Sequence, residues 1–196
     1  WHKGTGVRHV LVYDIGGGTL DTSLLYMNGK SVSVLGVAGD EHLGGSDFDM
    51  RMLKLLNSKL PSARPAAIEP PPLQRCDSNG LAILAEDAKI RLSSAERVEV
   101  RCRGDDGKSK ALEVTREEFE LASDDLFRRS MKPVETVLGD QMMTADVVDD
   151  VVLVGGASRT PKLRALLQDF MGSSKKLHTE IDPDITVAYG AANILD

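Results

Sequence analysis

The chain has 196 residues, of which 41% are apolar and 28% are charged, as in an ordinary globular protein. Its formal net charge of −6 argues against nucleic acid as a partner, because binding to a phosphate backbone requires a basic surface. No run of about 18 apolar residues occurs, which argues against membrane insertion. The chain starts at Trp1 without a methionine or a signal peptide, so we expect it to be a piece of a longer protein.

Three strands are predicted near the start of the chain, over residues 10–13, 22–26 and 31–37. The dipeptide Asn28-Gly29 favours a tight turn between the second and the third strand. Ser46 is predicted to cap the helix that follows. The apolar residues expected on the buried side of this helix are Phe48, Met52, Leu55, Leu56 and Leu60.

A proline-rich stretch occupies residues 61–80 and holds five of the eight prolines of the chain. Such a stretch cannot continue a helix or pair in a sheet, so we expect an exposed and mobile connection there. A helix over residues 81–92 and a hairpin of two strands, 97–103 and 109–114, are predicted to follow. One face of this helix carries Glu86, Lys89, Ile90 and Ser93, which are spaced i, i+3, i+4 and i+7.

The last third of the chain alternates strands and helices. Thr115-Arg-Glu-Glu118 is a capping box that opens a helix, and Pro133 is expected to break or kink that helix. The apolar run 151–154 predicts a strand that is buried on both faces. A glycine loop follows the strand, and further helices are expected from Pro161 to Gly172 and from Asp182 onward.

Cys76 and Cys102 are the only cysteines, and with four scattered histidines they form no recognisable metal-binding pattern. We expect each of them to be a small buried or incidental thiol. Cysteines of this kind favour a reducing compartment, so the cytoplasm is the expected location, with the lumen of the endoplasmic reticulum as the alternative.

The most informative segment is residues 12–21, which read Val-Tyr-Asp-Ile-Gly-Gly-Gly-Thr-Leu-Asp. Glycines let the backbone turn sharply and bring its N–H groups against phosphate oxygens. Asp14 and Asp21 flank the glycines and could hold a hydrated magnesium ion or orient a water molecule. Ligands of α/β folds usually lie at the carboxyl ends of strands, where this loop and the glycine loop after 151–154 are both predicted. The segment therefore predicts a loop that grips the phosphates of a nucleotide.

This loop resembles the phosphate-binding loop of the superfamily that contains actin, sugar kinases and heat-shock ATPases. Four further motifs follow it in order, and they read Ala38-Gly-Asp-Glu-His-Leu-Gly-Gly-Ser-Asp-Phe-Asp49, Glu86-Asp-Ala-Lys-Ile-Arg-Leu-Ser93, Val151-Val-Leu-Val-Gly-Gly-Ala-Ser-Arg-Thr-Pro-Lys162 and Asp182-Pro-Asp-Ile-Thr-Val-Ala-Tyr-Gly-Ala-Ala192. Together the five motifs resemble the second lobe of the ATPase domain of the seventy-kilodalton heat-shock chaperone family.

The resemblance implies an α/β fold with two parts. A ribonuclease-H-like (actin-like ATPase) subdomain would consist of residues 1–43 and 124–196. An α+β subdomain of residues 44–123, with the proline-rich loop at 61–80, would be inserted into it. The family divides its ATP site between two lobes, so the missing first lobe of the same domain is an implied partner, and this chain alone is expected to show negligible turnover.

The resemblance also implies ATP or ADP with Mg²⁺ as the bound groups. Asp14 would lie near the magnesium ion and its waters, Gly16, Gly17, Gly18 and Thr19 would line the β- and γ-phosphates, and Asp21 would place the attacking water. Gly44 and Gly45 would face the cleft, and Gly155, Gly156 and Ala157 would lie near the α-phosphate. Glu86 and Lys89 would bind the ribose. The adenine would contact Ser93 and Ile90, with Arg159 stacked on the base and Asp184 near the purine pocket.

Two residues depart from the family pattern. Ile90 stands where an arginine is usual, and Ala157 stands where a serine is usual. Isoleucine offers apolar contact but no cation–π contribution to the adenine, so we expect an adenine site that is weaker or differently balanced, by about 1 kcal/mol. The proline-rich stretch also replaces a regular helix of the inserted subdomain.

The implied function is the nucleotide-binding lobe of a heat-shock chaperone whose complete domain hydrolyses ATP to drive conformational change in a stress response. A nucleotide-exchange factor and J-domain co-chaperones would be partners of the parent protein. One alternative is a pseudo-ATPase that binds partners without hydrolysis, which Ile90 and Ala157 favour. The other is a kinase of the same superfamily, but no sugar-binding group of residues is found for it.

Overall fold

The computed structural model describes residues 6–66, 74–178 and 182–183. The chain divides into two compact units, of which unit 1 comprises Trp1–Gly45 with Phe127–Asp196 and unit 2 comprises Ser46–Leu126. The boundaries expected from the sequence, after residues 43 and 123, lie two and three residues earlier than these. Unit 2 is thus an insertion between two segments of unit 1.

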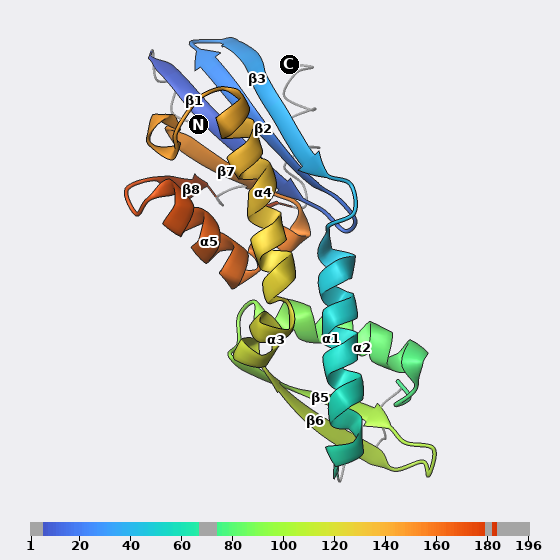
Figure 1. Ribbon diagram of the computed structural model, residues 1–196. Coiled ribbons are helices and arrows are strands. Elements are labelled where there is room, and N and C mark those ends of the chain that lie inside the picture. The colour runs from blue at the N-terminus through green and yellow to red at the C-terminus, as the bar shows by residue number, and fades with distance from the viewer. Residues whose placement is uncertain (1–5, 67–73, 179–181, 184–196) are drawn as a thin grey trace. The chain divides into compact units, whose positions relative to one another are not determined.

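Unit 1 is built on a five-stranded sheet of order β3-β2-β1-β7-β8 (Figure 1). The strands β1 (Val7–Ile15), β2 (Leu20–Asn28) and β3 (Ser31–Asp40) form an antiparallel meander. The strands β7 (Asp150–Val154) and β8 (Lys176–His178) continue the sheet in parallel with β1. This mixed sheet confirms the predicted α/β class and is the arrangement expected of an actin-like ATPase subdomain.

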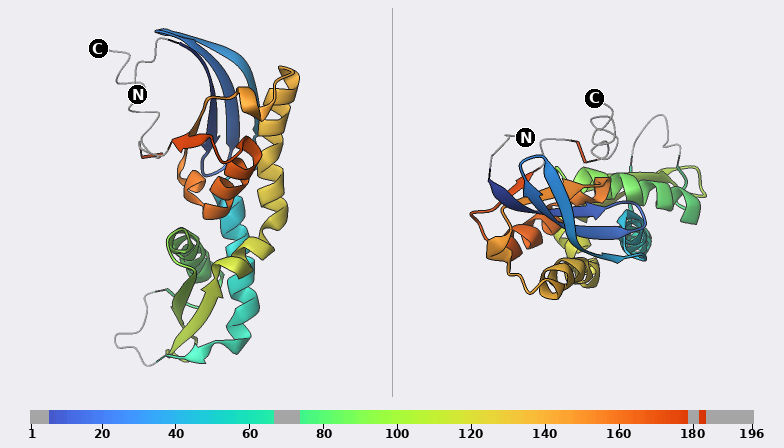
Figure 2. Two further views of the ribbon diagram at one scale, coloured as in Figure 1. Left: turned by 90° about the vertical axis from the view of Figure 1, so that its left-hand side faces the viewer. Right: turned by 90° about the horizontal axis from the view of Figure 1, so that it is seen from above.

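Two helices of unit 1 lie against the same face of this sheet, as Figure 2 shows. They are α4 (Asp124–Asp140), of which the first residues belong to unit 2, and α5 (Pro161–Met171). The Tyr13 hydroxyl of β1 donates to the carbonyl oxygen of Ser130 on α4 at 3.3 Å, and burial raises the pKa of Tyr13 to about 12. The core of unit 1 therefore lies between the sheet and these helices.

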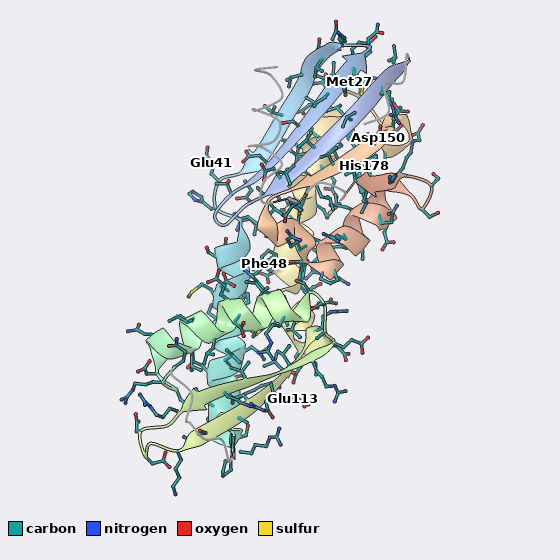
Figure 3. The ribbon with its side chains drawn as sticks, turned by 180° about the vertical axis from the view of Figure 1, so that it is seen from behind. Met27, Glu41, Phe48, Glu113, Asp150 and His178 are labelled. Atoms are coloured by element: carbon teal, nitrogen blue, oxygen red, sulfur yellow. A yellow bond between two sulfur atoms is a disulfide. The ribbon has the colours of Figure 1, made fainter. Side chains whose placement is uncertain are left out.

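The amino end of β7 carries a group of charged side chains. Asp150 accepts from Arg8 at 2.8 Å, and its other carboxylate oxygen lies 2.8 Å from Nε2 of His178 on β8. Figure 3 shows Asp150 and His178 close to one another across these two strands. This group lies at the opposite ends of the strands from the glycine loops, because Asp150 begins β7 and Gly155 follows its carboxyl end.

Unit 2 contains a three-stranded antiparallel sheet of order β4-β6-β5. Its strands are β4 (Arg64–Pro65), β5 (Arg97–Arg103) and β6 (Ser109–Thr115). Its helices are α1 (Gly45–Lys59), α2 (Ser78–Leu92) and α3 (Arg116–Ala122). The capping box at α3 is confirmed, since the Glu118 N–H donates to Oγ1 of Thr115 at 3.2 Å and the Thr115 N–H donates to Glu118 at 2.9 Å.

Three predictions of local structure are wrong in whole or in part. Ser46 does not cap α1, because Gly45 is already helical. Pro133 does not break its helix, because α4 runs through it and the break falls at Ser123, between α3 and α4, while the alternative of a kink at Pro133 stays a prediction. The 61–80 stretch is not irregular throughout, because its described part includes a 3₁₀ turn (Leu60–Ser62), strand β4 and the first turn of α2. The prediction for residues 67–73, which include Pro70, Pro71 and Pro72, lies outside the described residues. A proline is tolerated in β4 because this strand lies at the sheet edge, where a missing N–H costs no ladder bond.

The prediction for the cysteines is also wrong, because Cys76 and Cys102 form a disulfide. The bond joins the segment before α2 to β5, with Cα atoms 5.0 Å apart. Two backbone hydrogen bonds run beside it, from the Arg103 N–H to Gln74 and from the Cys76 N–H to Arg103, each at 2.9 Å. The spacing of the cysteines carried no signal of this pairing, since 26 residues separate them.

Within the described ranges, no helix has the length and apolar character needed to cross a membrane.

Candidate functional site

The first glycine loop joins β1 to β2 and lies at the carboxyl end of β1. The N–H of Gly16 donates to the carbonyl oxygen of Thr19 at 3.0 Å and closes the turn. Asp14 and Asp21 stand directly opposite each other in the β1–β2 pairing, one on each side of the loop. Gly17, Gly18 and Thr19 are exposed, so their backbone groups are open to a ligand.

Two carboxylates at this loop create a local excess of negative charge. Burial raises the pKa of the half-buried Asp14, and the nearby Asp21 carboxylate raises it further. Neither carboxylate makes an ion pair with a residue that the structure describes. A divalent cation would relieve this repulsion, and oxygen ligands suit Mg²⁺. No cluster of three metal-ligating side chains occurs in the described segments, so water and phosphate oxygens would complete the coordination.

The second glycine loop follows β7 and approaches the first one closely. Gly155 has a φ of +79°, which a residue with a side chain adopts only at a cost. A Cβ atom placed on Gly155 would lie 2.2 Å from the carbonyl oxygen of Ile15 and 2.9 Å from Oδ1 of Asp14. The parallel pairing of β1 with β7 therefore brings the two loops together at one edge of the sheet.

Gly44 and Gly45 support the first loop from the connection between β3 and α1. The N–H of Gly45 donates to the carbonyl oxygen of Gly16 at 2.9 Å. A Cβ atom on Gly44 would stand 2.5 Å from the backbone N of Gly18 and 2.6 Å from the carbonyl of Gly17. These contacts of Gly44 and Gly45 are with the backbone of the first glycine loop.

Gly39 was not among the predicted site residues, yet it lies opposite Asp21 in the pairing of β2 with β3. A Cβ atom at Gly39 would stand 2.9 Å from Oδ1 of Asp21 and 2.9 Å from the carbonyl oxygen of Leu20. The available signal was a glycine inside a strand, which often marks a close approach.

Arg129 was also missed, because its partners are distant in the sequence. This α4 residue donates to both carboxylate oxygens of Asp40 at 2.6 Å and to the carbonyl oxygen of His42 at 3.3 Å. The guanidinium beside Asp40 holds the pKa of that carboxyl below its usual value. Arg129 therefore anchors the segment that leads to Gly44, and no local pattern indicates a contact across 89 residues.

Helix α2 of unit 2 carries the residues assigned to the nucleoside. Asp77 caps it by accepting from the Gly80 N–H at 2.9 Å. Its buried residues are Gly80, Leu81, Ala85, Ala88 and Leu92. Glu86 and Ile90 are exposed on the other side, with Ile90 59% exposed, and Lys89 is half-buried. Ser93 forms the C-cap, and its N–H donates to Ile90 at 3.0 Å.

The remaining predicted site residues lie around the second loop. Gly156, Ala157 and Arg159 belong to a short 3₁₀ helix (Gly156–Arg159), and Arg159 forms an ion pair with Asp182. The carbonyl oxygen of Ser158 accepts from Nε of Arg164 at 2.9 Å, which fixes this turn to α5. Asp184 lies outside the described residues.

A mixed sheet in which a glycine loop follows β1 and another follows β7 defines a lobe of an actin-like ATPase domain. A family model described as Hsp70 protein matches residues 2–195 of the chain. The chain therefore belongs to the Hsp70 family, and this confirms the resemblance drawn from the five motifs.

Three relatives illustrate the match. A ribosome-associated molecular chaperone of Nakaseomyces delphensis is 40% identical over 188 residues, which cover 94% of this chain and 30% of that protein. A ribosome-associated molecular chaperone of Saccharomyces cerevisiae is 40% identical over 189 residues, with the same coverage of 94% and 30%. Heat shock 70 kDa protein BIP3 of Oryza sativa is 38% identical over 194 residues, which cover 97% of this chain and 28% of that protein. The chain thus spans about three tenths of the length of these relatives.

Proposed function

We propose that this chain forms one side of a Mg²⁺–ATP site and that its parent protein hydrolyses ATP in a chaperone cycle. The observation that carries the proposal is the meeting of the two glycine loops at Asp14 and Gly155. Exposed backbone N–H groups of the first loop and an electronegative pair of carboxylates beside them suit a polyphosphate with its cation.

In this proposal each part of unit 1 has one task. Gly16, Gly17, Gly18 and Thr19 bind the β- and γ-phosphates, and Gly155, Gly156 and Ala157 approach the α-phosphate. The magnesium ion, when bound, would neutralise charge on the phosphate oxygens, and Asp14 would hold it through water. Asp21, exposed at the rim of the loop, would orient the attacking water or accept its proton.

Unit 2 would bind the nucleoside through α2. The exposed face of Glu86 and Ile90, with Lys89 beside them, suits a ribose and a base, since a carboxylate accepts and an ammonium donates hydrogen bonds to hydroxyl groups. Ser93, Arg159 and Asp184 would complete the adenine side. Ile90 offers an apolar surface in place of a cation, which supports a site with weaker stacking.

Hydrolysis would need the first lobe of the parent domain. Phosphoryl transfer depends on groups positioned on both sides of the phosphate, and this chain supplies one side. Closure of the lobes on ATP would then regulate the chaperone cycle, with J-domain and nucleotide-exchange partners acting on the parent protein.

A test uses the two-lobed parent domain with Asp21→Asn, and with Asp140→Asn at an exposed carboxylate on α4 as a matched control. The proposal expects a loss of turnover of at least about 100-fold for Asp21→Asn with ATP affinity retained, and parent-like turnover for the control. A parent domain that binds ATP but shows no turnover would instead support a pseudo-ATPase.

The disulfide supports an oxidising compartment for this protein, such as the lumen of the endoplasmic reticulum, over the cytoplasm. A cytoplasmic location was expected because both cysteines were predicted to be free, but no free cysteine occurs among the described residues. Alkylation of free thiols in the protein from its native source, before and after reduction, would test this. Modification of Cys76 and Cys102 without prior reduction would contradict it.

A further inference from the structure

Lys89 on α2 makes an ion pair within unit 2 that its ribose role does not explain. Its Nζ lies 2.8 Å from Oδ1 of Asp49 on α1, and the two side chains are only 14% and 24% exposed. By contrast, the Asp87–Arg91 pair on the same helix is 53% and 46% exposed. The Lys89–Asp49 contact is therefore a fixed feature of the packing of α1 against α2 and not a mobile surface pair.

Glu86 stands three residues before Lys89, on the same face of α2. At this spacing a glutamate and a lysine on a helix surface attract each other. Glu86 makes no ion pair with any residue in the described part of the chain, while Asp49 contacts the lysine from a different helix. The Asp49 carboxylate thus competes with Glu86 for the ammonium group and leaves Glu86 as an acceptor.

We propose that Asp49 is a positioning residue for nucleoside binding, which holds the Lys89 ammonium in place and keeps Glu86 available to the ribose hydroxyls. This inference rests on the proposed function of α2. A lysine side chain is long and flexible, so fixing it before the ligand arrives removes part of the entropy cost of binding. An ammonium group carries three donors, so contact with one carboxylate is compatible with donation to a ribose hydroxyl.

The electrostatics of the cluster agree with this role. Burial raises the pKa of Asp49, the nearby Glu86 carboxylate raises it further, and Lys89 opposes both. The three groups together carry one excess negative charge when all are ionised. Removing Asp49 would leave a single carboxylate and a single ammonium on adjacent turns, which would pair with each other instead of with a ligand.

The test measures the affinity of the two-lobed parent domain for ATP and for 2′,3′-dideoxy-ATP, which lacks both ribose hydroxyls. The variants are Asp49→Asn, Lys89→Met and the double variant, with Asp87→Asn as a matched control on the outer side of α2. We expect Asp49→Asn to reduce the preference for ATP over the dideoxy nucleotide about tenfold, as for loss of a hydrogen bond to a charged group. In the Lys89→Met background, Asp49→Asn should not change the affinity ratio of the two nucleotides any further. Asp87→Asn should show the affinity ratio of the parent.

A purely structural role of Asp49 predicts a different result. Loosened packing of α1 against α2 would weaken both nucleotides equally and leave their affinity ratio unchanged, and this outcome would overturn the inference alone. A parent domain that binds neither nucleotide would overturn the proposed function and this inference with it. Thermal unfolding of each variant shows whether the fold is retained.

Discussion

Gly155 lies against Asp14, although the two residues are far apart in the sequence: Asp14 belongs to β1, and Gly155 directly follows β7, which pairs with β1 in parallel. A side chain on Gly155 would begin 2.9 Å from Oδ1 of Asp14, and its Cβ atom would be only 2.2 Å from the carbonyl oxygen of Ile15. The half-buried carboxylate of Asp14 therefore lies close to the backbone of the second glycine loop. This contact makes the two loops one site.

Gly155→Ala should disrupt this site. Its Cβ atom would strike backbone, which cannot rotate away, so we expect ATP affinity of the parent domain to fall at least about tenfold. Gly172→Ala is the matched control, because Gly172 has a similar φ of +86° but open space around its Cβ position. The control should lose about 1 kcal/mol of stability with unchanged ATP affinity. Equal losses of affinity in the two variants, measured by calorimetry, would contradict the account.

Gly39→Ala should act through Asp21. The new methyl group would displace the Asp21 carboxylate or the Leu20 carbonyl, so turnover should fall about 10- to 100-fold with ATP affinity largely retained. Gly36→Ala on the same strand meets only the side chains of Gln141 and Val137, at 3.1 and 3.2 Å, and serves as the control. In an Asp21→Asn background, Gly39→Ala should lower the turnover rate little further. Additive losses in single-turnover rates would show that Gly39 does not act through Asp21.

Reduction of the disulfide should destabilise unit 2. A cross-link over 26 residues limits the unfolded chain and contributes about 3.5 kcal/mol in the chain-entropy treatment. Urea denaturation of the chain with and without reductant measures this difference. A Cys76→Ala, Cys102→Ala double variant should have the same free energy of unfolding as the reduced protein, with or without reductant. If reductant leaves the stability of the parent unchanged, the prediction is refuted.

Arg129→Met should lower stability near neutral pH by about 1 kcal/mol, since half-exposed ion pairs contribute modestly even in good geometry. The pKa of Asp40 is lowered in the folded state, so its contribution is present above the unfolded pKa of about 3.9 and is lost as the pH falls through the lower folded pKa. Parent and variant should therefore converge below about pH 4. Denaturation midpoints at a series of pH values test this, and a difference that grows on acidification would have the wrong sign.

The elements with strong local signals were predictable from the sequence. The β1–β3 meander, the α3 capping box and the strand of residues 151–154 follow from alternation, turn residues and apolar runs, and the order of five motifs indicated the family. Contacts set by tertiary packing were not predictable. Gly39 beside Asp21, Arg129 on Asp40 and the Cys76–Cys102 bond depend on register and on chain segments meeting from a distance, which one-dimensional spacing does not record.

The two ends of the proline-rich stretch differ from the prediction for a related reason. A high proline content predicted a loop, but Pro65 lies at a sheet edge, where its missing N–H is harmless, and Asp77 starts α2 one turn earlier than the apolar pattern indicated. Local propensity was overridden there by an edge position and a cap.

Calorimetric titration of ATP with Mg²⁺ into the two-lobed parent domain, and into this chain alone, is the decisive measurement for a nucleotide site at the two glycine loops. We expect saturable, magnesium-dependent binding to the parent domain, loss of affinity in Gly155→Ala, and weak or absent binding to the single lobe. Failure of the parent domain to bind ATP at all would rule out this site and leave the two glycine loops as inherited architecture without a nucleotide.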